Sequence, residues 1–341
     1  GREGMRGFRI LLSMLLVLLA VPAMAQGLTK VRFIHEWRFE GHVAPYLVAL
    51  DKGFYKEEGL DVSIDPGTGS VDGINRIAAG AYDMGSMDIN SLIKYRDGAD
   101  AVPIKAVLMT YNKPAFAVLT LKKNNITKPK DIEGKRLGAP AGDAAWQQWP
   151  IFAKENGIDT SKIKVENVGF AVRETLLAQG QVDAVTAFIS NKLALNAIGV
   201  PDDQIQAMMM SDYGVHLYGS AVMVNPEFAK AHPDAVKGFV KATIRGFVFA
   251  YQHPEEAIKS IMNHNPVAKP DIELQRLKVV NEYCYFTDDV LKNGFGDVDM
   301  TRLESSIDQL ATTFPFKNKP KASDVFTSEY LPPKEERMVK N

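Results

Sequence analysis

Short apolar runs alternate with amphipathic segments along most of the chain. Residues 31–34 form the first such run and predict a buried strand, and the segment 43–56 carries apolar residues at helical spacing and closes at Gly59. The same order of strand, turn and helix recurs, which is typical of a parallel sheet covered by helices. Further strands are expected at residues 60–64, 83–85, 102–110, 115–121, 136–139, 163–168, 183–188 and 218–224, and helices at 71–79, 88–95, 143–156 and 172–179.

The stretch 69–83 reappears one hundred residues later in the chain. Each copy carries two glycines and an aspartate at matched positions: Gly69, Gly80 and Asp83, and then Gly169, Gly180 and Asp183. Both copies have the order helix, glycine, strand, and a second echo links residues 54–61 to residues 152–159. Two consecutive repeated units predict two similar lobes. The residues that the two copies share are expected to form the scaffold. Ligand specificity is expected to come from positions at which the copies differ, such as Ser70 and Phe170.

After residue 224 the pattern changes to amphipathic helices without partner strands, at residues 226–251, 254–262, 271–285 and 300–312. These helices are expected to pack back on the first lobe. The first lobe then comprises residues 26–116 and 220–341, and the second lobe, residues 117–219, is inserted between them. The chain crosses between the lobes twice, near residues 114–121 and 213–222, and two crossings make a hinge.

The N-terminal segment predicts export. Arg6 and Arg9 precede an apolar run at residues 10–21, and small residues end the segment at Ala25, which are the features of a cleaved signal peptide over residues 1–25. The apolar run is too short to cross about 30 Å of hydrocarbon as a helix. Gln26 stands where a lipid-anchored protein carries cysteine. We therefore expect a protein free in the periplasm, with no lipid anchor.

Composition narrows the function classes. The 341 residues carry a net charge of −1, which becomes −3 when the three Arg and one Glu of residues 1–25 are removed. Because Lys and Arg are scattered among acids, no nucleic-acid partner is expected. Cys284 is the only cysteine, which excludes an intramolecular disulfide and a cysteine-based metal centre. No metal or cofactor is expected, and the methionine run 208–210 predicts an edge strand or packing.

Four segments resemble a known family. They are residues 46–62 (YLVALDKGFYKEEGLDV), 126–138, 180–185 (GQVDAV) and 225–228 (NPEF). These segments are similar to periplasmic solute-binding proteins of ABC importers in the NMT1/THI5-like group, which includes taurine, nitrate and alkanesulfonate binders. The resemblance implies a type II periplasmic binding protein, an α/β fold of two Rossmann-like lobes with a ligand cleft between them. It also implies a monomer that closes on a small-molecule solute and then docks on a membrane permease.

Ligands in open α/β sheets bind beyond the carboxyl ends of the strands. In the first lobe this rule selects Glu36, Trp37, Phe39, His42, Gly69, Ser70, Met87, Asp88 and Tyr111. Trp37 is expected either to stack on a flat heterocycle, the role that the resemblance implies, or to seal the lobe edge. The histidine that the family places six residues after this tryptophan falls at Val43, and His42 lies one place early. Ser70 is predicted to cap a helix, and Asp88 to cap a helix or to pair with a cation.

In the second lobe the same rule selects Gly142, Asp143, Trp146, Phe188 and Asn191, together with Tyr218 at the return crossing. Asp143 is expected to cap a helix at a position where sulfonate binders of the family carry small residues and Ser or Thr. Its charge opposes a sulfonate or nitrate, because a buried like charge is costly. Tyr218 belongs either to the hinge packing or to the pocket.

The aromatic residues of the second lobe have separate expected roles. Trp146 and Trp149 lie one helical turn apart, and we expect Trp146 in the pocket and Trp149 in packing. Phe188 is expected as a wall opposite Trp37. Asn191 is expected to present its amide to a ring nitrogen of the ligand.

The sequence therefore predicts a binding protein for a neutral or cationic flat solute, such as a thiamine-precursor pyrimidine. Taurine, an alkanesulfonate or another small organic anion is the alternative. Fungal members of the family are enzymes that make the thiamine pyrimidine from a histidine and a bound vitamin, with a cysteine cluster that a one-cysteine chain lacks. A hydrolase that uses Asp88 and Asp143 is a further alternative. We expect no catalytic residue, because no G-x-S-x-G, H-E-x-x-H or P-loop spacing occurs.

Overall fold

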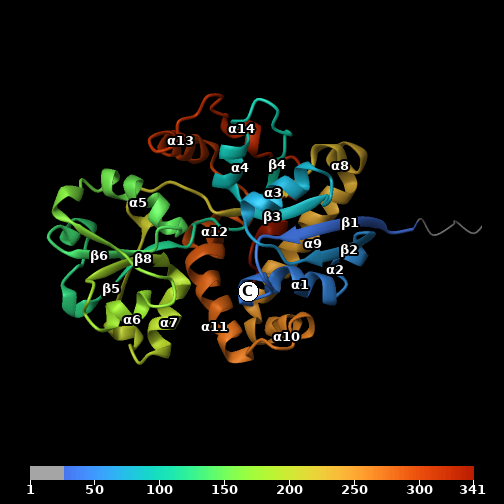
Figure 1. The fold of residues 1–341 in the computed structure, drawn as a ribbon. Coiled ribbons are helices and arrows are strands. Elements are labelled where there is room, and N and C mark those ends of the chain that lie inside the picture. Colours follow the sequence, from blue (N-terminus) through green and yellow to red (C-terminus); the bar gives the residue numbers. More distant parts are fainter. Residues whose placement is uncertain (1–26) are drawn as a thin grey trace, which may run out of the picture.

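The computed structural model describes residues 27–341, and the predicted signal peptide, residues 1–25, lies outside them. Two five-stranded sheets form the centres of two lobes, each flanked by helices (Figure 1). The first sheet has the order β2-β1-β3-β10-β4, with β1 (Thr29–His35), β2 (Leu60–Asp65), β3 (Met84–Asp88), β4 (Lys105–Met109) and β10 (Ser220–Val224). The second has the order β7-β6-β8-β5-β9, with β5 (Phe116–Leu121), β6 (Arg136–Ala139), β7 (Lys164–Asn167), β8 (Ala184–Phe188) and β9 (Ile205–Met209).

The two sheets have the same layout. In the first sheet β1 runs parallel to β2 and β3, and β10 runs antiparallel to β3 and β4. In the second sheet β6 runs parallel to β7 and β8, and β5 runs antiparallel to β8 and β9. The chain leaves the first sheet after β4 and returns after β9. The observed architecture is the α/β fold of two lobes and two crossings that the sequence pattern predicts. Met208 and Met209 end β9, the edge strand of the second sheet, and Met210 begins the 3₁₀ turn that follows.

Helices cover both sheets, and several begin or end where the prediction does not place them. Gly53, in the left-handed region at φ 77°, interrupts the predicted helix 43–56. Pro233 divides the predicted helix 226–251, because its ring restricts His232 to non-helical angles. Residues 281–285 form a π-helical turn. The helices are α1 (Ala44–Asp51), α2 (Phe54–Glu57), α3 (Ser70–Ala78), α4 (Ile89–Tyr95), α5 (Ala144–Glu155), α6 (Arg173–Ala178), α7 (Lys192–Ala197), α8 (Pro226–Ala231), α9 (Pro233–Gln252), α10 (Pro254–His264), α11 (Pro270–Val280), α12 (Asp288–Asn293), α13 (Met300–Ala311) and α14 (Ala322–Val325).

One arginine–aspartate unit explains the repeated sequence. In the first lobe Asp83 Oδ2 accepts hydrogen bonds from the backbone N and the Nε of Arg32, at 2.8 and 3.2 Å. The same guanidinium donates to the carbonyl of Gly80, which lies in the left-handed region at φ 77°. The unit therefore fixes the middle of β1 to the turn that precedes β3. The second lobe repeats these contacts with Arg136, Asp183 and Gly180.

Two of the C-terminal helices, α9 and α10, pack on the first lobe. α9 and α10 lie against α1, and the ring of Phe239 stacks on the rings of Phe33 and Tyr55 with centroids 5.1 and 4.9 Å apart. α11 stands between the lobes in Figure 1 and contacts the 3₁₀ turns Gly41–Val43 of the first lobe and Ile189–Asn191 of the second. It is thus a third element that touches both lobes. In the described part of the chain, no helix combines the length and the apolarity that a membrane crossing requires.

Candidate functional site

A cavity of about 820 Å³ lies between the two lobes. Its walls come from the carboxyl ends of β1, β3 and β8, from the loops before α5 and α6, and from one face of α11. The rule that ligands bind beyond the carboxyl ends of the strands, which we call the strand-end rule, thus selects residues that share one cavity. The chain supplies these residues from distant segments. The predicted residues that line it are Glu36, Trp37, His42, Gly69, Ser70, Asp88, Tyr111, Gly142, Asp143, Phe188 and Asn191.

Two predicted residues of the first lobe do not line the cavity. Phe39 turns toward α10, where its carbonyl accepts a hydrogen bond from Asn265 Nδ2 at 3.0 Å and its ring meets His264 edge-on. Met87 is fully buried on the helix-covered face of the sheet, so close to Gly73 that a Cβ there would lie 2.1 Å from Met87 Cε. Successive side chains of a strand point to opposite faces of the sheet, and that of Met87 points away from the cavity.

Trp146 and Tyr218 also lie outside the cavity. The ring of Trp146 stacks on that of Trp149, with centroids 6.4 Å apart, so both tryptophans of α5 belong to packing. Tyr218 is 1% exposed, and the Arg302 guanidinium lies 3.6 Å from its ring centroid. The Tyr218 hydroxyl accepts a hydrogen bond from the backbone N of Asp299 at 2.9 Å. Of the two roles predicted for Tyr218, hinge packing and pocket lining, the structure shows hinge packing.

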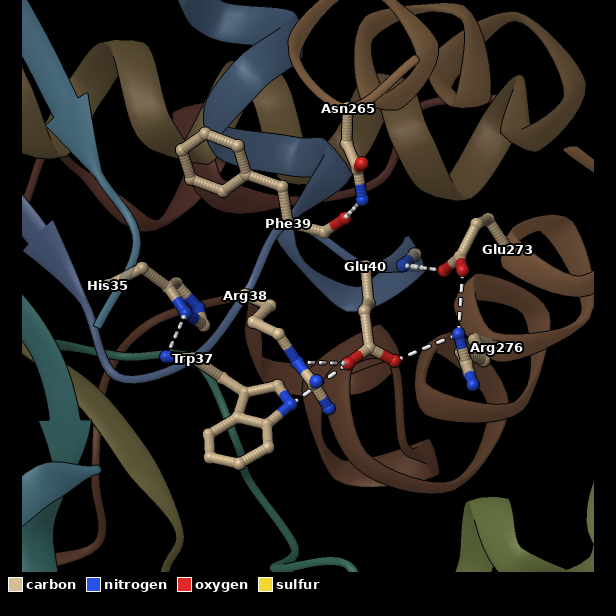
Figure 2. A network of polar contacts seen from close by, with 9 residues as sticks. His35, Trp37, Arg38, Phe39, Glu40, Asn265, Glu273 and Arg276 are labelled. Carbon is tan, nitrogen blue, oxygen red and sulfur yellow. Dashed lines mark hydrogen bonds and ion pairs between the residues drawn. The ribbon is translucent and has the colours of Figure 1, made fainter. Parts of the chain in front are cut away.

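The Trp37 side chain is held by a polar chain that leads to α11 (Figure 2). Trp37 Nε1 donates to Glu40 Oε1 at 2.9 Å, and Arg276 Nη1 lies 2.8 Å from Glu40 Oε2. The same Arg276 nitrogen donates to Glu273 Oε1 at 2.6 Å, and Glu273 Oε2 accepts from the backbone N of Gly41, also at 2.6 Å. One turn of α11 therefore fixes both the indole and the loop that carries it. We call residues 36–42 the Trp37 arm.

Glu36 lies on the first-lobe wall between two serines. Its Oε1 accepts a hydrogen bond from Ser220 Oγ at 2.6 Å and its Oε2 accepts one from Ser86 Oγ at 3.0 Å. Burial raises the pKa of Glu36 to about 7, although both serine hydrogen bonds favour the charged form. Burial also lowers the pKa of His42 to about 4, so this imidazole is neutral at pH 7.

The helix starts beside Glu36 differ from the prediction in one respect. Ser70 does not cap α3, because Gly69 occupies the cap position at φ 113°. The Ser70 hydroxyl instead accepts a hydrogen bond from the backbone N of Asp88 at 2.9 Å. Asp88 caps α4 by accepting from the backbone N of Asn90 at 3.1 Å, and burial raises the pKa of its carboxyl. Asp88 therefore serves as a cap and also faces the cavity.

The second-lobe wall contains a buried charge cluster around Asp143. The Asp143 carboxylate caps α5, accepting from Ala145 N at 3.3 Å, and accepts from Thr186 Oγ1 at 3.0 Å. Arg173 Nη1 lies 3.8 Å from Asp143 Oδ2, and Arg173 Nε donates to Glu174 Oε1 at 2.9 Å. Burial raises the pKa of Asp143, and the Arg173 charge opposes that shift. The repulsion of anions that we predict for Asp143 alone is therefore reduced by an arginine that the sequence pattern did not select.

Aromatic side chains from both lobes are exposed within the cavity. Trp37 is 42% exposed on the first lobe, and Phe170 and Phe188 are 56% and 39% exposed on the second. In the sequence Phe170 stands out only as a difference between the repeats, at the position of Ser70. Asn191 also lines this wall, and its Oδ1 accepts a hydrogen bond from the backbone N of Phe188 at 2.8 Å. Large apolar side chains gathered in one concave site are typical of small-molecule pockets.

Two other side chains bear on the chemistry of the site. Arg276 lines the cavity although it comes from the C-terminal helices, where no strand end marks a site residue. Cys284 is buried and does not line the cavity, and burial raises the pKa of its thiol. Within residues 27–341, no group of three or more His, Cys, Asp or Glu side chains is placed to hold a metal ion.

The sequence model described as NMT1/THI5 like matches residues 40–257. The chain belongs to the NMT1/THI5-like family. One relative, the 4-amino-5-hydroxymethyl-2-methylpyrimidine phosphate synthase of Legionella pneumophila, is 25% identical over 245 residues, covering 72% of this chain and 76% of the relative. The formylaminopyrimidine-binding protein of Halalkalibacterium halodurans is 23% identical over 291 residues, covering 82% of this chain and 86% of the relative.

Solved structures show the same fold. The periplasmic aliphatic sulphonate binding protein SsuA from Escherichia coli superposes with a TM-score of 0.65 at 13% identity, covering 91% of this chain and 92% of the other. At this identity the likeness concerns the fold alone. The predicted periplasmic-binding-protein fold, with two lobes and a cleft between them, is confirmed for this NMT1/THI5-like chain.

Proposed function

We propose that this protein is the solute-binding component of an ABC importer and that its solute is a small, flat, neutral or cationic heterocycle. The observation that carries the proposal is the set of exposed aromatic rings that line one cavity between two lobes, Trp37 from the first lobe and Phe170 and Phe188 from the second. A flat ring bound between them covers apolar surface on both lobes. A solute that contacts both lobes binds the closed state more tightly than the open state, and it therefore shifts the protein toward the closed state.

The charges of the cavity support a donor-rich solute. Glu36 and Asp88 face it from the first lobe. Each of its two arginines already has carboxylate partners, Arg276 with Glu40 and Glu273, and Arg173 with Glu174 and Asp143. Among the described residues, carboxyl groups without a cationic partner, Glu36 and Asp88, therefore outnumber arginines without a carboxylate partner on the cavity walls. An aminopyrimidine fits this balance, since its ring nitrogens and amino group pair with carboxyl and amide side chains. The pyrimidine-related names of the relatives agree with this ligand class.

We further propose that the protein acts in the periplasm and delivers the solute to a permease of the inner membrane. The periplasmic fold neighbour supports this role, and so does the sequence pattern of residues 1–25. The ligand-binding residues of the proposal are the cavity residues named above, with Trp37 as the stacking platform and Glu36 as the principal acceptor.

Two alternatives have specific support. A small organic anion, such as taurine or an alkanesulfonate, is favoured by the two arginines on the cavity walls. A pyrimidine-forming enzyme is favoured by the synthase name of the Legionella relative. We propose binding over catalysis because Cys284, the sole cysteine, is buried away from the cavity.

A calorimetric titration separates these functions. Purified protein is titrated with 4-amino-5-hydroxymethyl-2-methylpyrimidine, formylaminopyrimidine, taurine and an alkanesulfonate. We expect heat of binding from at least one pyrimidine and its loss in Trp37→Ala, whereas the control Trp146→Phe, outside the cavity, binds as the wild type does. Binding of the sulfonates alone would contradict the proposal. Recovery of the bound pyrimidine with its mass unchanged, measured by mass spectrometry, distinguishes binding from hydrolysis.

A further inference from the structure

Arg173 is a buried cation with an unused hydrogen-bonding edge at the cavity. The residue is 4% exposed and lines the cavity from the second lobe. Its Nε donates to Glu174, and its Nη1 donates to the carbonyl of Thr186 at 3.3 Å and lies 3.8 Å from Asp143 Oδ2. Its Nη2 makes no hydrogen bond with any residue in the range 27–341. A ligand that displaces cavity water from this nitrogen must offer an acceptor in its place, or the N–H groups lose their hydrogen bonds.

We propose that Arg173 Nη2 binds an uncharged acceptor oxygen of the solute, of the formyl or amide carbonyl class. This inference rests on the proposed function and specifies one end of its ligand. Two carboxylates, Asp143 and Glu174, already surround the single guanidinium charge. A neutral oxygen accepts the hydrogen bond without adding a third negative charge to this buried cluster, and an anion would add one. The charges therefore select a carbonyl over a phosphate, sulfonate or carboxylate.

The position of Arg173 also sets where the carbonyl lies on the solute. Its guanidinium carbon is 5.6 Å from the ring centroid of Phe170, one of the exposed aromatic walls. Glu36 and Asp88 accept hydrogen bonds at the opposite, first-lobe wall. The solute is thus a flat ring with donor groups at the first-lobe end and a carbonyl substituent at the second-lobe end. A solute of this polarity links the two lobes, which is the condition for stabilising closure.

The test compares two neutral aminopyrimidines and one anionic one by calorimetry. Formylaminopyrimidine carries the carbonyl, 4-amino-5-hydroxymethyl-2-methylpyrimidine lacks it, and the phosphate ester of the latter is the anion. The wild type should bind formylaminopyrimidine roughly 10-fold to 100-fold more tightly than the hydroxymethyl compound, as for a hydrogen bond to a charged donor. In Arg173→Lys, which keeps a cation beside Glu174, this ratio should fall close to one. Arg136→Lys, in the scaffold unit away from the cavity, should keep the wild-type ratio.

Each contrary result has a separate meaning. Equal binding of the two neutral compounds by the wild type overturns the Arg173 inference and leaves the proposed function standing. Equal weakening of both compounds in Arg173→Lys overturns the inference in the same way. Tightest binding of the phosphate ester overturns the choice of a neutral acceptor. Binding of none of the three overturns the proposed function, and the Arg173 inference with it. The ratio of the two affinities in the wild type is measured without any variant. It therefore tests the Arg173 inference even if Arg173→Lys does not fold.

Discussion

The indole nitrogen of Trp37 lies 2.9 Å from Glu40 Oε1, and the other oxygen of this carboxylate lies 2.8 Å from Arg276 Nη1 (Figure 2). The most exposed aromatic residue of the first-lobe wall is therefore fixed by a helix that also touches the second lobe. An exposed side chain held in one orientation loses less entropy when a ligand binds. The arrangement prepares Trp37 to act as a stacking surface before any solute arrives.

Replacing Arg276 should loosen the Trp37 arm. In Arg276→Met, Glu40 and Glu273 lose their shared cation, and the indole loses its fixed partner. We expect affinity for the pyrimidine to fall about 3-fold to 10-fold, which is the effect of roughly 0.7–1.4 kcal/mol of lost preorganisation. Acrylamide quenching of tryptophan fluorescence in the ligand-free protein should increase. Titration calorimetry and quenching measure the two effects.

A matched control lies on the same helix. Lys278 pairs with Glu255 at 3.5 Å, with both side chains well exposed. Lys278→Met should change neither affinity nor quenching, because exposed pairs of this kind contribute little. If both variants behave alike, Arg276 has no positioning role.

A methyl group at Gly41 should separate the Trp37 arm from α11. A Cβ at Gly41 would lie 2.1 Å from the carbonyl oxygen of Glu273 and 2.9 Å from the backbone N of Leu277. Gly41→Ala should lower the free energy of unfolding by about 1–3 kcal/mol, the usual cost of overpacking. Gly142→Ala is the control, because a Cβ there meets nothing within 4 Å. Chemical denaturation of both variants tests the difference, and an equal stability of the two would refute the close packing.

Removing the buried cation of the second lobe should be costly. Arg173→Met leaves Asp143 and Glu174 without their counter-charge at 4% and 8% exposure. We expect a loss of about 3–5 kcal/mol in the free energy of unfolding at pH 7. The loss should shrink toward acidic pH, where the carboxylates become protonated. Lys164→Met, beside Glu166 on an exposed strand, is the control and should change stability by about 0.5 kcal/mol or less.

Glu36 should make stability depend on pH between about 4.5 and 7. Its pKa rises from 4.5 to about 7 in the folded protein, so the folded state binds the proton more tightly than the unfolded state does. This contribution is fully present below pH 4.5 and is lost as pH rises through about 7. The unfolding free energy of the wild type, relative to Glu36→Gln, should fall by about 1–3 kcal/mol between pH 4.5 and pH 8, a range that allows for solvent screening. A constant difference would show that the carboxyl titrates normally.

Local patterns were enough for much of the fold and for part of the site. Strand and helix periods, and the repeat of residues 69–83 at 169–183, predict two α/β lobes, because backbone geometry and burial impose those periods within short segments. The strand-end rule also selects Glu36, Asp88, Asp143 and Phe188 without knowledge of their neighbours, because parallel strands bring their carboxyl ends to one edge.

Side-chain direction and charge partners depend on contacts between distant segments. Met87 and Trp146 follow the same strand-end rule and yet lie outside the cavity, because Met87 packs into the interior and Trp146 packs on Trp149. Glu273 reaches the Trp37 arm across 232 residues of sequence. Arg173 offsets the charge of Asp143 only because the loop before α6 folds beside the start of α5. The sequence by itself determined the two lobes and the edge where they meet. Tertiary packing alone decided which charges in the cavity are compensated, because burial and a partner within a few ångströms set the energy of a charge.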